Sequence, residues 1–216
     1  MTTSISAIVP VKNAADHVRA ALASIFAQEH RPDEVVVVDG RSTDATLDVV
    51  AEFAEVRVVH QTGEGLADAR NLGVAETGGA LVAYLDADDR WIPDKTARQV
   101  AWLATHPDVG IVTGMMVRVG GADWEPAPVP GMTPGAALIR RDALARVGPF
   151  DTRHRIGCDT DWLMRARELG VGPVLLDDVV LHKGVRGDSL SRDVDEYRRE
   201  LLRVARDAVR RREGPG

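Results

Sequence analysis

Four short apolar segments recur within the first 85 residues of the chain, and a helical pattern follows each of the first three. The segments are residues 5–9, 34–39, 56–60 and 80–85. The continuous valines of residues 35–38 indicate a strand that is buried on both faces, as strands of parallel sheets are. Because crossovers between parallel strands are right-handed, this order predicts a doubly wound α/β sheet with helices on both faces.

The second half of the chain continues with shorter elements. We expect strands at 109–119 and 135–140, strand-like runs at 174–176 and 179–181, and helices after Pro93, at 141–147, at 159–169 and from 192 onwards. Asp159 is expected to cap its helix and Gly170 to end it. The glycine- and proline-rich residues 120–131 predict a loop in which Trp124 packs, and residues 182–191 a polar loop.

The composition of the chain excludes several classes of protein. Its 216 residues are 44% hydrophobic and 28% charged, as in an ordinary globular protein, and its net charge of -6 argues against a nucleic-acid surface. Cys158 is the single cysteine, which excludes an internal disulfide and a cysteine-based zinc site. The N-terminus lacks the basic region of a signal peptide, and no apolar run approaches the ~20 residues of a membrane span. We therefore expect a cytoplasmic protein.

Acidic residues stand at the carboxyl ends of two expected strands. Asp39 closes the second strand, and Asp86 and Asp88 follow the fourth. Open α/β sheets bind their ligands at this edge, and carboxylate oxygens are the ligands that Mg²⁺ and Mn²⁺ prefer. The structural alternative is that Asp88 or Asp89 caps a helix that starts near Pro93.

Motifs of several other enzyme classes are absent. Residues 10–14 lack the glycine fingerprint of a dinucleotide site, and Asp68 falls where a third glycine would have to follow Gly63 and Gly65. The chain also lacks a glycine-rich, lysine-containing phosphate loop and the nucleophile elbow of esterases. These absences disfavour hydride transfer, phosphoryl transfer from a nucleoside triphosphate and ester hydrolysis. A metal-bound diphosphate leaving group stays compatible with the acidic edge.

Several stretches of the sequence, taken in order, form a recognisable set. They are AIVPVKN (7–13), VVDGRSTD (37–44), ARNLG (69–73), LDADDRWIP (85–93), and VGPFD (147–151) with DTDW (159–162). In this order and spacing they resemble glycosyltransferase family 2, over about residues 5–191. The resemblance implies a GT-A fold, a single domain with a Rossmann-like, doubly wound mixed sheet. It also implies inverting transfer of a sugar from a nucleoside diphosphate sugar to an acceptor hydroxyl by single displacement.

The resemblance also divides the chain. The GT-A domain is expected at 1–192, with a nucleotide-binding half at 1–90 and an acceptor-binding half at 91–192, followed by a C-terminal helix and tail at 193–216. That last helix carries an apolar stripe and many arginines, so we expect it to pack on the domain and keep a solvated face. Peripheral contact with a membrane is the less favoured alternative, because the apolar stripe is narrow and poor in aromatic residues.

The resemblance assigns binding roles to individual residues. Asp88 is the expected ligand of the divalent metal, Mn²⁺ or Mg²⁺, and Asp86 its neighbour beside the ribose. His182 lies near the third metal ligand of many GT-A enzymes, the alternative being an ordinary loop histidine. Arg70 is expected to help hold the nucleotide, although it could instead form an ion pair on a helix face. The full expected donor site is Pro10, Val11, Asn13, Asp39, Arg70, Asp86, Ala87 and Asp88.

The expected catalytic base is Asp159, and Asp161 is the second candidate. A carboxylate must remove the proton of the acceptor hydroxyl as its oxygen attacks the anomeric carbon opposite the leaving diphosphate. The structural alternatives are a helix cap for Asp159 and a first-turn carboxylate for Asp161. Cys158 stands where the family usually has glutamate, which keeps a non-catalytic nucleotide-sugar-binding domain open. A sugar nucleotidyltransferase is less favoured, because its basic glycine-rich loop is absent.

Departures from the family pattern concern the donor. Lys12 stands where an aromatic residue often stacks on uracil, and Gly40 where an aspartate often reads the base. A UDP-sugar is the expected donor, with GDP- and dTDP-sugars as alternatives. Lys183 and Arg186 are expected to meet the diphosphate when their loop closes. The sequence does not identify the hydroxyl acceptor.

Overall fold

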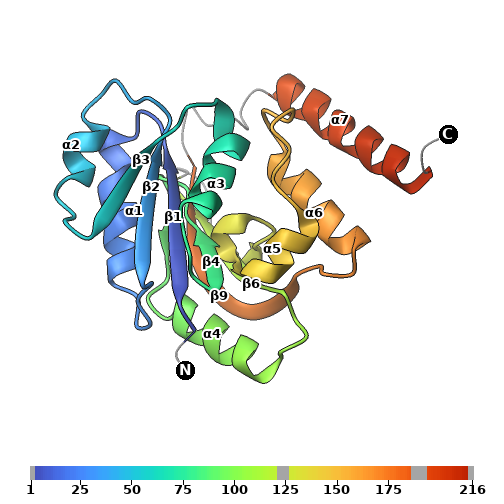
Figure 1. Cartoon of the computed structure of the whole chain (residues 1–216), viewed down its shortest axis with the longest axis horizontal. Helices are drawn as coiled ribbons and strands as arrows, with labels where there is room; N and C mark the ends of the chain where they lie inside the picture. The colour runs from blue at the N-terminus through green and yellow to red at the C-terminus, as the bar shows by residue number, and fades with distance from the viewer. Residues whose placement is uncertain (1–2, 121–126, 186–193, 214–216) are drawn as a thin grey trace.

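The computed structural model describes residues 3–120, 127–185 and 194–213. Within them, nine strands form one mixed sheet in the order β3-β2-β1-β4-β8-β6-β9-β5, with β7 paired to β6 (Figure 1). The strands are β1 (Ile5–Val11), β2 (Glu34–Asp39), β3 (Val56–His60), β4 (Leu81–Tyr84), β5 (Arg90–Trp91), β6 (Ile111–Val119), β7 (Val129–Pro130), β8 (Leu138–Arg140) and β9 (Val174–Gly184). The helices are α1 (Ala15–Phe26), α2 (Thr46–Val50), α3 (Gly65–Ala75), α4 (Lys95–Thr105), α5 (Arg141–Val147), α6 (Cys158–Glu168) and α7 (Val194–Glu213), with a 3₁₀ turn, η1 (Pro134–Ala136). This helix-flanked mixed sheet confirms the predicted fold class.

The central strand of the N-terminal half, β1, determines where a ligand site can form. It contains no charged residue and is buried along its whole length. It pairs in parallel with β2 and with β4, and β2 pairs in parallel with β3, which confirms the four parallel strands expected from the sequence. Because β1, β2 and β4 run in the same direction, the residues that follow them lie at one edge of the sheet.

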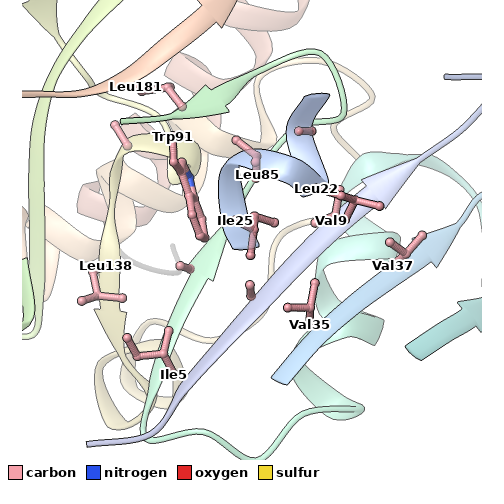
Figure 2. Packing of buried hydrophobic residues seen from close by; sticks show 14 of the residues in the cluster. Ile5, Val9, Leu22, Ile25, Val35, Val37, Leu85, Trp91, Leu138 and Leu181 are labelled. Atoms are coloured by element: carbon pink, nitrogen blue, oxygen red, sulfur yellow. The ribbon is translucent and has the colours of Figure 1, made fainter. Parts of the chain in front are cut away.

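Alternate residues of β1 face two different layers of helices. Ile5 and Val9 belong to a core cluster that includes Leu22 and Ile25 of α1 (Figure 2). Ile8 belongs to a second cluster with residues of α3, α5 and α6 on the opposite face. Since side chains alternate across a strand, a strand between two helical layers buries both faces and is apolar at most positions. Buried Ser6 is the polar residue of β1, and its hydroxyl donates to Glu34 Oε1 at 2.7 Å. Burial of both faces explains the apolar runs of the sequence.

The C-terminal half of the sheet mixes strand directions. β4 pairs antiparallel with β8, and β6 pairs antiparallel with β8 but parallel with β9. β9 is one strand of 11 residues, where the sequence suggested two short runs and a loop. Asp177 and Asp178 interrupt its apolar pattern, and its register against β6 shifts between Thr113 and Met116. As a result His182 and Lys183 lie in the sheet and not in a loop.

The acidic residues after β4 lead into a strand and not into a helix. β5 pairs antiparallel with β9, and buried Trp91 donates its indole N–H to the carbonyl of Gly135 at 3.0 Å. Helix α4 begins only at Lys95, with Asp94 at its N-cap position. The helix-cap alternative for Asp88 and Asp89 is therefore wrong.

Two further details differ from the sequence prediction. Helix α6 begins at Cys158, with Gly157 at the N-cap position at φ +84°, so Asp159 lies in the first turn and does not cap the helix. The region 120–131 contains the short strand β7, while Trp124 lies outside the described residues.

Helix α7 lies beside α6 at the upper right of Figure 1. Its Val204 and Ala208 are buried, while Leu202 and Val209 are about half exposed. Among the residues that the structure describes, no helix combines the length and the apolar character needed to cross a membrane.

Candidate active site

The chain leaves β4 through an acidic turn at the edge where β1 and β2 also end. The N–H of Leu85 donates to the carbonyl of Ile8 at 3.0 Å, which continues the pairing with β1 by one residue. The N–H of Asp89 then donates to the carbonyl of Asp86 at 3.0 Å and closes the turn. Three carboxylates, including that of Asp88, are thereby placed within four residues of each other.

Arg70 lies at the centre of the candidate site although its side chain is fully buried. It extends from α3, where Gly73 allows close packing on β1, since a Cβ there would lie 2.3 Å from Ile8 Cγ2. Its Nη2 donates to Asp86 Oδ1 at 3.0 Å, and its Nη1 donates to Asp159 Oδ1. Burial alone would lower the pKa of Arg70, but the carboxylates of Asp159 and Asp86 outweigh burial and raise it. Arg70 thus joins the acidic turn to the start of α6.

Two aromatic rings pack near the guanidinium of Arg70, and the side-chain amide of Asn71 holds one of them, Phe150, through its backbone. Its Cζ lies 5.4 Å from the ring centroid of Phe150 and 5.9 Å from that of Tyr84. The neighbouring Asn71 donates its side-chain N–H to the carbonyl of Phe150 at 2.9 Å and accepts the N–H of Phe150 at 2.8 Å. The sequence assigned no role to Asn71, and its place beside Arg70 in the 69–73 motif is the signal that was missed.

The end of β9 closes over the acidic turn. Lys183 Nζ lies 3.1 Å from Asp89 Oδ2 and 3.6 Å from Asp86 Oδ2. The N–H of Gly184 donates to Asp89 Oδ1 at 2.9 Å, and a Cβ at Gly184 would lie 2.3 Å from the carbonyl oxygen of Asp88. Burial, followed by the charge of Asp86, raises the pKa of Asp89 to about 7. Burial alone would lower the pKa of Lys183, but the negative charges of Asp86 and Asp89 outweigh burial, so the pKa is raised above its ordinary value.

Asp159 and Asp161 point to opposite sides of α6, because residues two apart on a helix are separated by about 200°. Asp159 faces Arg70, and its side chain is 26% exposed. Asp161 is 1% exposed and accepts hydrogen bonds from Arg165 Nε at 2.8 Å and Arg211 Nη1 at 2.9 Å. Of the two expected catalytic carboxylates, the structure therefore brings only Asp159 to the Arg70 cluster.

Cys158 lies beside the pair formed by Arg70 and Asp159. Its Sγ is 3.8 Å from Arg70 Nη1 and 3.3 Å from Asp159 Oδ1. Burial, followed by the nearby charge of Asp159, raises the pKa of the thiol to about 12. The thiol of Cys158 is therefore neutral near pH 7.

Asp39 and Asn13 lie at the ends of β2 and β1 at the same edge. Buried Asp39 accepts the N–H of Ser42 at 3.1 Å, and its Oδ2 is 3.5 Å from His60 Nδ1. Asn13 adopts a φ of +49° and accepts the N–H of Thr43 at 2.8 Å. These contacts tie the two loops together beside the strand ends.

The remaining expected site residues have other surroundings. Pro10 and Val11 are buried within β1, and Ala87 packs partly buried against the core. His182 pairs in register with Arg90. Strand alternation directs its side chain away from the face that Lys183 uses. Metal binding by His182 stays a prediction, and it is Lys183 that contacts the acidic turn.

The chemistry of the acidic turn suits a hard divalent cation. Its donors are carboxylate oxygens, the ligands that Mg²⁺ and Mn²⁺ prefer. Within the described part of the chain, Arg70 contacts Asp86, and Lys183 contacts both Asp86 and Asp89. Asp88 contributes its negative charge to the same turn, since its carboxylate raises the pKa of both Asp89 and Lys183.

Known proteins with similar sequences are named as glycosyltransferases. Residues 6–159 match the family described as Glycosyl transferase family 2. A PGL/p-HBAD biosynthesis glycosyltransferase of Mycobacterium bovis (strain BCG) is 34% identical over 174 residues, which are 74% of this chain and 68% of that protein. An uncharacterized glycosyltransferase of Nostoc sp. is 37% identical over 113 residues, 50% of this chain, so the matched part spans about a third (35%) of that relative.

Solved structures share the architecture. The mannosyltransferase PcManGT from Pyrobaculum calidifontis, in complex with GDP-Man and Mn²⁺, has a TM-score of 0.77 and 26% identity over 100% of this chain and 66% of its own. TarS 1-349 of S. aureus, in complex with UDP-GlcNAc, has a TM-score of 0.77 and 21% identity over 94% of this chain and 65% of its own, a likeness of fold alone. On the family match and the shared architecture, the chain belongs to glycosyl transferase family 2 and has the GT-A fold.

Proposed function

We propose that this chain is a metal-dependent inverting glycosyltransferase that transfers a sugar from a nucleoside diphosphate sugar to an acceptor hydroxyl by single displacement. The observation that carries the proposal is the double contact of Arg70, which binds Asp86 on one side and Asp159 on the other. One buried side chain thereby sets the spacing between the carboxylate expected at the donor and the carboxylate expected at the acceptor. Direct displacement requires such fixed spacing, because the attacking and leaving oxygens lie on opposite sides of the anomeric carbon.

Asp159 is the proposed general base. Arg70 holds one of its carboxylate oxygens, and the side chain keeps enough exposed surface to receive a proton from an acceptor hydroxyl. Cys158 is neutral near pH 7, so it does not compete for this role. Asp161 is enclosed by two arginines and is proposed to be structural.

Asp88 and Asp86 are proposed to hold the divalent cation, Mn²⁺ or Mg²⁺, beside the diphosphate. When bound, such a cation neutralises negative charge on a departing diphosphate. Lys183 already contacts this turn and is proposed to bind a diphosphate oxygen. Asp39 and Asn13 are proposed to hold the nucleoside.

The ligands in the two neighbouring structures support a nucleoside diphosphate sugar as the donor. TarS is solved with UDP-GlcNAc, and PcManGT with GDP-Man and Mn²⁺. We propose a UDP-sugar as the first donor to test and GDP- and dTDP-sugars as the next. The acceptor is a hydroxyl compound.

Metal-dependent donor binding is the direct test. UDP-GlcNAc, GDP-Man and a dTDP-sugar are each titrated in a thermal unfolding assay, with Mn²⁺ or with EDTA. A donor at 100 times its dissociation constant is expected to stabilise the wild type by ~2.7 kcal/mol, and only with Mn²⁺. Asp88→Ala is expected to lose this stabilisation, whereas Asp108→Ala, at an exposed position, is expected to keep it. If none of the donors stabilises the wild type, the proposal is wrong.

A further inference from the structure

A cavity of about 470 Å³ lies between α7 and the loop that follows Phe150, and arginines line most of it. The lining residues are Arg153, Arg203, Arg206, Asp207 and Arg210, which we call the arginine pocket. The four residues from α7 follow an i, i+3, i+4, i+7 spacing, which places them on one face of the helix. Arg153 approaches from the loop, so the guanidinium groups come from two separate elements.

Acidic groups lie close to three of the arginines that line the arginine pocket. Arg153 is paired with Asp151 at 2.6 Å and lies 3.9 Å from Asp207, Arg203 is paired with Glu200 at 3.1 Å, and Arg210 lies 4.0 Å from Asp207. The side chains of Arg153, Arg203 and Arg210 are between 59% and 80% exposed, so water screens these pairs. A guanidinium also has five N–H donors, more than one carboxylate can accept. The pocket can therefore donate further hydrogen bonds to an anion.

A buried histidine lies behind the arginine pocket. His154 is fully buried, and within the described part of the chain neither of its ring nitrogens has a hydrogen-bond partner. Its Nε2 faces Asp207 Oδ2 at 3.6 Å and Asp151 Oδ2 at 3.9 Å. The carboxylate of Asp207 therefore lies between the buried imidazole of His154 and the arginines that line the cavity.

The polar groups at this place do not favour a cation. Asp151, His154 and Asp161 bring possible ligand atoms within 4.8 Å of one another. However, Asp151 already binds Arg153, and Asp161 already binds Arg211 and a second arginine. The guanidinium groups that line the cavity would repel a metal ion.

We propose that the arginine pocket binds a phosphate group of a ligand. Arginine forks match the geometry of phosphate oxygens and bind them through two parallel hydrogen bonds. The phosphate can belong to a soluble phosphorylated compound or to a lipid headgroup. Because α7 packs on the Asp161 side of α6, away from Asp159, this phosphate site is separate from the candidate catalytic surface and does not rest on the proposed function.

Titration of the full chain with inorganic pyrophosphate tests the proposal. EDTA is present, so that the metal-dependent donor site does not contribute. Arg206→Gln/Arg210→Gln is expected to bind pyrophosphate about 10- to 100-fold more weakly than the wild type. The control Arg198→Gln/Arg199→Gln removes the same charge from exposed positions of the same helix and is expected to bind as the wild type does. No binding by the wild type, or equal weakening in both variants, would overturn the proposal.

Vesicles separate the two sources of phosphate. Phosphatidylcholine vesicles with or without phosphatidic acid are sedimented with each variant. Binding that requires phosphatidic acid and is lost only in Arg206→Gln/Arg210→Gln supports a lipid headgroup. Pyrophosphate binding without such sedimentation supports a soluble phosphorylated ligand. Donor hydrolysis is expected to be unchanged in the pocket variant. If the wild type does not hydrolyse the donor, the proposed function is contradicted. The pyrophosphate titration tests the arginine pocket independently of that result.

Discussion

The two carboxylates in the first turn of α6 belong to two charge clusters that differ in which partner is buried. Asp159 contacts Arg70, a cation with no exposed surface, whose partners Asp159 and Asp86 are 26% and 22% exposed. Asp161 is itself 1% exposed, whereas its partner Arg211 is 31% exposed. The buried charge is positive on one side of the helix and negative on the other.

The sign of the buried charge determines what each side offers to a ligand. A buried cation orients carboxylates that reach solvent, so the Arg70 side presents negative groups suited to a hydroxyl or a metal. A buried carboxylate holds Arg165 and Arg211, whose side chains are 17% and 31% exposed, so the α7 side also presents positive groups. The arginine pocket on this side is lined by other arginines. Two positions on one helix thereby separate the candidate catalytic surface from the arginine pocket.

The largest expected difference is in the rate of sugar transfer. Asp159→Asn is expected to lower the rate about 10²–10⁴-fold, the usual contribution of a general base, while donor binding persists. Asp161→Asn removes a carboxylate from the same helical turn and is expected to keep a rate close to the wild type. Initial rates at saturating donor measure both variants. Equal losses in the two variants would contradict the distinction between the two sides of α6.

Arg70→Leu tests the buried cation through stability. The substitution leaves the carboxylates of Asp86 and Asp159 next to an apolar side chain, so we expect a loss of about 3–5 kcal/mol in the free energy of unfolding. Urea denaturation measures it. Arg19→Leu breaks an exposed pair with Glu52 and is expected to cost about 0–1 kcal/mol. A cost for Arg70→Leu as small as that of the control would show that the cluster is not held by its buried charge.

A double-mutant cycle tests the opposite arrangement around Asp161. Asp161→Asn removes a buried charge that accepts two hydrogen bonds, so we expect a cost of about 1–3 kcal/mol in unfolding free energy. Its coupling with Arg211→Gln is expected to be on the order of 1 kcal/mol, because Arg211 is partly exposed. Urea denaturation of the wild type, both single variants and the double variant gives the coupling. Additive costs would mean that the contact contributes nothing.

Sequence patterns predict the parallel half of the fold well, because β1, β2 and β4 are buried on both faces and are rich in apolar residues. The edge strand β3 is partly exposed and includes Arg57 and His60. The C-terminal half is harder to predict. Asp177 and Asp178 interrupt β9 at a register shift, and the two-residue strand β5 is too short to show any periodicity. Long-range pairing, and not local pattern, determines both strands.

The candidate site was predictable where it rests on strand ends and motifs. Asp86, Asp88 and Asp39 follow from the order of the strands. The sequence already favoured Asp159 over Asp161 as the base, and the separation of the two side chains follows from helical geometry once the helix is known to begin at Cys158. The contact between Lys183 and the acidic turn becomes visible only in the structure, where β9 extends to Gly184 and so includes Lys183.

Lys95 provides a second buried cation for comparison with Arg70. Its side chain is fully buried, and its Nζ donates to Gln99 Oε1 at 2.8 Å and to the carbonyl of Ala137 at 3.0 Å. Among the described residues it has no carboxylate in ion-pairing distance. Burial therefore lowers the pKa of Lys95 to about 7, whereas the carboxylates around Arg70 raise the pKa of that guanidinium.

The last expected effect is a pH-dependent slope in stability, which Lys95→Met is expected to remove. Between about pH 7 and the unfolded pKa near 10.4, the unfolded chain binds more protons than the folded chain. Lys95 therefore makes stability rise with pH across this range, by at most about 1.4 kcal/mol per pH unit, while the buried charge is fully unfavourable below it. Urea denaturation from pH 6 to 10 should show the wild type gaining stability relative to Lys95→Met as pH rises. Lys12→Met, at an exposed position, is the control, and parallel curves for all three proteins would show that Lys95 stays charged through its polar contacts.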